Sequence, residues 1–217
     1  MNCPHCSAVL ASDAGECRNC GFSVRSIRAL LGAEWVRLER LTDNGNCLSL
    51  KEQRHLEIIL DEFERTFPQC FFAVYLGALP PTISARDLGF WLINHGAFHT
   101  REMAKRNDFG CALVIDDSRE TLALTVGYAL EGHLSEAELQ RILKQSCMLL
   151  EGRHFGAAIE RVVELTQQTL SKAAQPRPET APNNLGRVNA DLGEIGLQPL
   201  RAAHRPARQD VSRGHPS

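Results

Sequence analysis

The chain has 217 residues, of which 43% are hydrophobic and 23% are charged, a composition that supplies one globular core and a small additional unit. Its formal net charge of -2 lacks the positive excess that drives nonspecific nucleic-acid binding. No segment approaches the ~20 consecutive apolar residues of a membrane span, and the N-terminus has no signal-peptide pattern, so we expect a cytoplasmic protein without a membrane span.

Four of the eight cysteines form two CxxC pairs at the start of the chain, Cys3 with Cys6 and Cys17 with Cys20. In a reducing compartment such pairs are typical of metal sites and not of disulfides. Gly21 after the second pair permits a left-handed turn that points amide N–H groups at sulfur. We predict a structural Zn²⁺ in a zinc ribbon, because four protein ligands leave no position for a substrate. An iron centre or a redox dithiol is the alternative.

The ribbon is too short to bury a core, so the metal is expected to supply its folding free energy. His5 lies between two ligands and is expected to point at solvent. Basic residues near the ribbon are few, and Phe22 is the nearby aromatic residue; the basic residues are Arg18, Arg25 and Arg28. This pattern favours a protein partner of unknown identity, or a simple capping role for the ribbon, over nucleic acid.

Residues 24–41 carry apolar side chains at helical spacing, with charged residues between them. We therefore predict a connecting amphipathic helix that docks on the main domain; the alternative is that its apolar face pairs with a second copy of the chain. Its apolar residues are Ile27, Leu30, Leu31, Trp35, Leu38 and Leu41.

The main domain is predicted over residues 42–173 and begins with a helix capped by Ser49 and Glu52. The apolar run at 70–76 predicts a buried strand, and Ser84 opens a second helix.

Residues 111–116 and 121–127 predict two strands, and because four residues separate them they must form an antiparallel hairpin. A helix opened by Ser135 and a final helix from about Phe155 follow. This order predicts an α/β fold, a small mixed sheet covered by helices on both faces, an α/β/α sandwich. The remaining residues, 174–217, hold six of the ten prolines and are expected to be disordered.

Acidic residues are the remaining candidates for chemistry, since no Ser elbow, P-loop, dinucleotide turn or HExxH is present. If Asp43 and Asp108 meet at one end of the sheet, their oxygens could bind a divalent cation, Ca²⁺ or Mg²⁺. The simpler interpretation is that both are turn or cap residues and that Asp116 and Asp117 form the hairpin tip.

Several segments of the main domain together resemble the TPM domain family. They are Asp43 with Leu48-Ser49, the strand FFAVYL, Asn107-Asp108-Phe109-Gly110 before CALVID, Thr125-Val126-Gly127-Tyr128, and the run from Glu151 to Ile159. The resemblance spans roughly residues 42 to 172 and implies an α/β/α sandwich. It implies either protein binding or a weak acid phosphatase or calcium-binding activity, with Asp43 and Asp108 as the acidic-site candidates.

We therefore expect a zinc ribbon, residues 1–23, joined to a TPM-like domain that acts mainly as a binding or regulatory module. The alternative is a weak metal-assisted phosphatase, a hydrolase in which a cation held by Asp43 and Asp108 polarises a phosphoryl oxygen.

Overall fold

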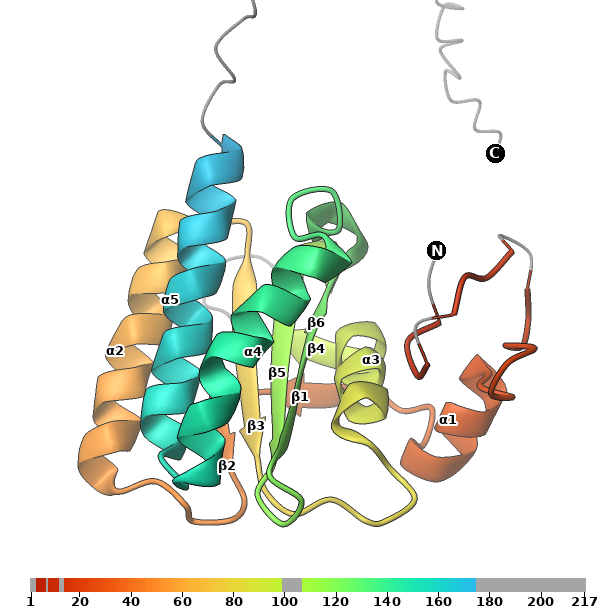
Figure 1. Ribbon diagram of the computed structural model, residues 1–217, viewed down its shortest axis with the longest axis horizontal. Helices are drawn as coiled ribbons and strands as arrows, with labels where there is room; N and C mark the ends of the chain where they lie inside the picture. Colours follow the sequence, from red (N-terminus) through yellow and green to blue (C-terminus); the bar gives the residue numbers. More distant parts are fainter. Residues whose placement is uncertain (1–2, 7, 12–13, 99–106, 175–217) are drawn as a thin grey trace, which may run out of the picture. The chain divides into compact units, whose positions relative to one another are not determined.

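The computed structural model describes residues 3–6, 8–11, 14–98 and 107–174 (Figure 1). The predicted disordered tail, residues 174–217, lies outside the described residues except for Ala174. In chain order the elements are α1 (Val24–Leu31), β1 (Val36–Leu38), β2 (Leu41–Asp43), α2 (Leu50–Thr66), β3 (Phe71–Leu76), α3 (Ala85–His95), β4 (Gly96–Phe98), the 3₁₀ turn η1 (Asn107–Phe109), β5 (Gly110–Asp116), β6 (Thr121–Val126), the 3₁₀ turn η2 (Tyr128–Leu130), α4 (Glu136–Glu151) and α5 (Phe155–Ala174).

The main sheet has four strands in the order β2-β3-β5-β6. Strands β2, β3 and β5 run parallel, and β6 returns antiparallel to β5 as the short connection requires. The predicted hairpin and the mixed character of the sheet are therefore confirmed. Strand β6 lies at one edge and pairs with β5 as its one described strand neighbour.

Helices cover both faces of this sheet, as the α/β/α prediction requires (Figure 1). On one face the buried side chains of α2, α4 and α5 meet alternate residues of the strands, such as Phe72, Leu113 and Leu124. On the other face α3 packs with α1 and β1 against the intervening residues, such as Phe71 and Ala112. Two apolar clusters therefore hold the sheet between its helical layers.

The predicted helix starts are confirmed by their side-chain caps. Ser49 accepts a hydrogen bond from the backbone of Glu52, whose carboxylate accepts one from the backbone of Ser49 in return. Ser84 and Asp87 form the same reciprocal pair at the start of α3, and Ser135 caps α4. Each pair satisfies backbone donors that the first helical turn leaves without partners.

The predicted connecting helix over residues 24–41 is wrong in its second half. Helix α1 ends at Leu31, where Gly32 adopts a φ of +91° and donates to the carbonyl of Arg28. The chain then forms β1, which pairs in parallel with β4, and then β2. The three short strands β1, β2 and β4 were not predicted, because three residues are too few to show an alternating pattern.

None of the helices in the described part of the chain combines the length and apolar character that crossing a membrane requires.

Candidate metal centre

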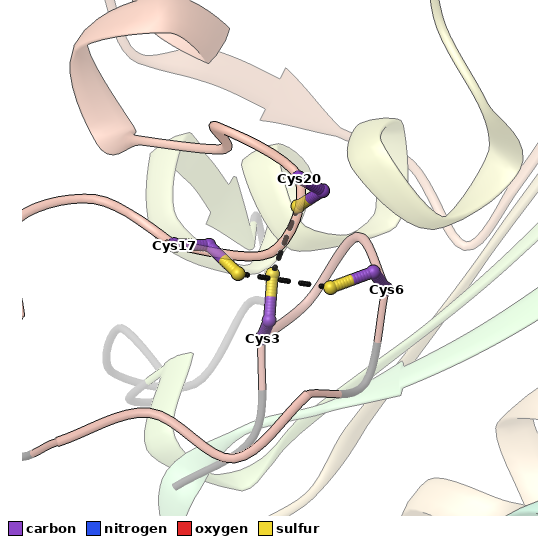
Figure 2. Close-up of side chains that lie close together, drawn as sticks. All are labelled: Cys3, Cys6, Cys17 and Cys20. Carbon is purple, nitrogen blue, oxygen red and sulfur yellow. Dashed lines mark hydrogen bonds between the residues drawn. The ribbon is translucent and has the colours of Figure 1, made fainter.

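The four cysteines of the ribbon come together around one point, as Figure 2 shows. Their Sγ atoms all lie within 4.8 Å of one another. Cys3 Sγ is 3.7 Å from Cys20 Sγ, and Cys6 Sγ is 3.7 Å from Cys17 Sγ. Sulfur atoms at these separations could share one metal ion, and a set of four thiolates is compatible with tetrahedral zinc. All four ligand positions would then be filled by the protein.

Backbone hydrogen bonds hold the two CxxC turns in shape. Cys3 N donates to the carbonyl of Ala8 and Cys17 N to that of Phe22, both at 2.8 Å. Gly21 adopts a φ of +72° and donates to the carbonyl of Cys17 at 2.8 Å. The left-handed turn expected at Gly21 is therefore present. Its positive φ is unfavourable for residues that carry a Cβ atom.

The electrostatics of the cluster differ from one sulfur to the next. Asn19 donates a hydrogen bond to Cys6 Sγ at 3.4 Å and lowers the pKa of the Cys6 thiol to about 6. Desolvation raises the pKa of Cys20 to about 12 and also raises the pKa of Cys3. The thiol of Cys6 is therefore deprotonated easily, whereas deprotonation of Cys3 and Cys20 is disfavoured. A divalent cation would compensate the crowded charge and favour the thiolate at every position.

The ribbon contacts helix α3 through side chains that the sequence did not pair. His5 Nδ1 lies 2.8 Å from Asp87 Oδ1, so the expectation that His5 points only at solvent is wrong. Phe22 stacks on the His5 ring at 6.1 Å between centroids and meets Phe90 of α3 edge-on at 5.5 Å. Asp87 has a double role, because its Oδ2 accepts from Ser84 in the cap of α3 while its Oδ1 bonds the ribbon.

The two acidic candidates of the main domain lie at opposite ends of the sheet. Asp43 pairs with Leu76, and Leu76 pairs with Ile115 near the end of β5. Asp108 precedes Gly110, the first residue of β5. The steps from Gly110 to Ile115 span about 17 Å at ~3.3 Å per residue. Asp43 and Asp108 therefore do not form the shared divalent-cation site that was predicted.

Asp43 is committed to its own loop. Its two carboxylate oxygens accept hydrogen bonds from the backbone of Cys47 at 3.0 Å and Leu48 at 2.9 Å. This geometry is that of a turn residue that leads the chain from β2 into α2. The simpler interpretation of Asp43 is the one that the structure supports.

A different carboxylate lies close to this loop. Asp117 Oδ2 is 3.6 Å from Cys47 Sγ, and Asp117 Oδ1 is buried without a hydrogen-bond partner among the described residues. Burial raises the pKa of the Cys47 thiol, with the charges of Asp117 and Asp43 adding to the effect. Sequence reasoning placed Asp117 at the hairpin tip but did not place it beside the loop that follows Asp43, because β2 was not recognised. The neighbouring Asp116 is fully buried and bonds Ser118 and Arg119.

In the comparison with known protein families, residues 41–169 match the family described as the TPM domain. The chain is similar to an N-terminal domain from P. gingivalis, with 19% identity, 68% of this chain and 88% of that chain covered, and a TM-score of 0.49. It is also similar to an N-terminal domain from Corynebacterium glutamicum, with 12% identity, 64% of this chain and 84% of that chain covered, and a TM-score of 0.47. A third is a protein of Bizionia argentinensis, with 13% identity, 60% of this chain and 86% of that chain covered, and a TM-score of 0.46. All three are NMR structures. No curated protein matches the chain significantly.

Proposed function

The chain belongs to the TPM domain family, and from that premise we propose that it acts in the cytoplasm as a protein-binding module whose zinc ribbon forms part of the binding surface. The ribbon at residues 1–23 and the TPM domain at residues 42–173 are the two parts of this proposal. The observation that carries it is the closed cluster of four sulfur atoms seated against α3. A metal enclosed by four protein ligands has no open position for a reactant, so its contribution is to shape a surface.

Two contacts support a ribbon that is fixed to the domain. The His5–Asp87 hydrogen bond is polar and partly buried, and the Phe22 and Phe90 rings add an apolar contact beside it. Aromatic pairs of this geometry contribute roughly 0.5–1.5 kcal/mol beyond their buried area. The ribbon and α3 would therefore present one continuous surface.

The phosphatase alternative loses its predicted centre, because Asp43 and Asp108 lie at different ends of the sheet. Among the described residues, the four cysteines are the one group of three or more ligand-type side chains close enough to hold an ion. The pair Asp43 and Asp117 does not reach that number. Binding is therefore the function that the arrangement supports best.

Metal analysis tests the first part of the proposal. Purified protein is expected to contain about one zinc ion per chain. Cys20→Ser should lose that zinc together with the protease resistance of the N-terminal segment. Cys147→Ser is the matched control, because Cys147 is an exposed cysteine on α4 far from the cluster in sequence. Equal zinc content in the two variants would contradict the assignment.

Partner capture and an activity assay test the second part. Proteins recovered on the wild-type chain should be retained by Cys147→Ser and lost by Cys20→Ser. An aryl phosphate assay is the counter-test: turnover that disappears in Asp117→Asn while the variant remains folded would replace binding by catalysis as the main function.

A further inference from the structure

A groove of about 720 Å³ runs along the outer edge of β6. Helix α3 supplies one wall, α4 supplies the other, and the ribbon closes part of it; Figure 1 shows β6 lying between these two helices. The lining is largely apolar. Its main side chains are Phe90 and Ile93 of α3, Leu122 and Leu124 of β6, and Leu139 and Leu143 of α4.

On its outer side the backbone of β6 has hydrogen-bonding groups that no other strand in the described part of the chain pairs with. Gly127 N donates to the carbonyl of Gly110 at 2.8 Å, which marks the two as a hydrogen-bonded pair of the antiparallel ladder. Such pairs recur at every second residue, so the N–H and C=O groups of Leu122, Leu124 and Val126 point away from β5. No strand of the described residues accepts or donates there.

The charged residues that line the groove indicate which kind of peptide segment could bind there. Glu16, Glu131 and Glu136 are exposed carboxylates of its lining, whereas Arg86 is the one cation among the described lining residues. An exposed aromatic residue, Tyr128, lies beside them with 82% of its surface accessible. The surroundings therefore favour a basic segment with apolar side chains.

We propose that the outer edge of β6 binds an extended, basic and apolar peptide segment of a partner protein, which adds a fifth strand to the sheet between α3 and α4. Unpaired edge strands bind extended peptides through main-chain hydrogen bonds, with pockets for alternate side chains setting specificity. A second copy of this chain fits less well, because edge-to-edge pairing would bring the same three glutamates together. The inference rests on the proposed binding function and names its partner class and surface.

The probe is an extended peptide of about seven residues, the usual length of a strand, that alternates valine with lysine. Two derivatives carry N-methyl groups, one on every valine and the other on every lysine. In a strand only one of these two sets of N–H groups can face β6. Fluorescence anisotropy with the zinc-loaded full-length chain should show one derivative binding like the parent and the other about tenfold or more weaker. Equal binding of the two derivatives, or no binding of the parent at millimolar concentration, overturns the proposal.

The charge preference is tested in the same anisotropy assay, and the location of the site is tested by NMR and sedimentation. A peptide with glutamate in place of lysine should bind about tenfold more weakly, and the difference should shrink at high salt. The double variant Glu131→Gln and Glu136→Gln should reduce the preference for lysine. Amide NMR shifts should concentrate on residues 121–127. Shifts confined to another surface, or sedimentation showing that the chains pair with one another through this edge, overturn the assignment of a partner segment.

The outcomes separate this inference from the proposed function. If Cys20→Ser abolishes partner capture but the peptides do not bind, the module binds partners elsewhere and the groove assignment fails. If the peptides bind with the expected N-methyl pattern while Cys20→Ser leaves partner capture unchanged, the edge is a binding site and the role of the ribbon fails.

Discussion

Replacing Asp43 with asparagine distinguishes a structural role of this carboxylate from a catalytic one. Both oxygens of Asp43 accept backbone hydrogen bonds, from Cys47 and from Leu48. Asparagine keeps one acceptor oxygen and turns an NH₂ group toward the other N–H donor. One partly buried backbone donor then loses its partner, which costs about 1–3 kcal/mol. Leu48 is itself buried in the main core, so displacement of the loop adds to this cost and does not relieve it.

The expected loss of about 2 kcal/mol corresponds to a fall in Tm of roughly 4–8 °C for a domain of this size. Urea and thermal unfolding followed by circular dichroism measure it. Asp61→Asn is the matched control, because Asp61 is partly exposed and forms ion pairs with Arg65 and Arg40 near the surface, where such a change costs below about 1 kcal/mol. Zinc content should be unchanged in both variants. An Asp43→Asn protein as stable as the wild type, but without an aryl phosphatase activity that the wild type has, would refute the structural account.

Three further predictions follow from named contacts. Arg40→Gln removes a two-pronged ion pair with the buried Glu64, and because Arg40 is 34% exposed the expected loss in unfolding free energy is about 2 kcal/mol, measured by urea denaturation. Zinc binding must remove protons from Cys3 and Cys20, whose pKa values are raised, so zinc affinity measured by competition with a chelator should fall at least about a hundredfold per pH unit on acidification. Burial opposes ionisation of Asp116, but its hydrogen bonds leave the pKa of this carboxyl below its ordinary value. The stabilisation is therefore present above the unfolded pKa of about 3.9 and is lost as pH falls through the lower native pKa. Asp116→Asn should flatten the pH dependence of the unfolding free energy below about pH 5.

The parts of the fold that the sequence predicted well are those with local causes. Ser49 with Glu52 and Ser84 with Asp87 specify helix starts within four residues of chain, and the structure contains both pairs. The hairpin of β5 and β6 was equally predictable, because four connecting residues exclude a parallel crossover. The CxxC spacing predicted the convergence of sulfur atoms for the same reason, since each pair is a local turn.

The prediction of the acidic site was wrong because it depended on the position of β2, a strand that was not predicted from the sequence. Asp43 ends β2 and Asp108 precedes β5, and the two strands run parallel in one sheet. A residue at the end of one parallel strand and a residue before the start of another necessarily lie at opposite ends of the strands. Recognising β2 would have placed Asp43 at the same end of the sheet as Asp117, but a strand of three residues is too short to show an alternating hydrophobic pattern.

The contact of the ribbon with α3 links the two proposals physically. Asp87 uses one oxygen to cap α3 and the other to bind His5, so the position of the ribbon and the first turn of the helix share a side chain. The same helix presents Phe90 both to Phe22 of the ribbon and to the groove along β6. Cys3 and Cys17 line that groove as well. A metal bound by the four sulfur atoms would therefore also hold in place the part of the groove that the ribbon closes. Under the two proposals, the ion would shape a binding surface and take no part in chemistry.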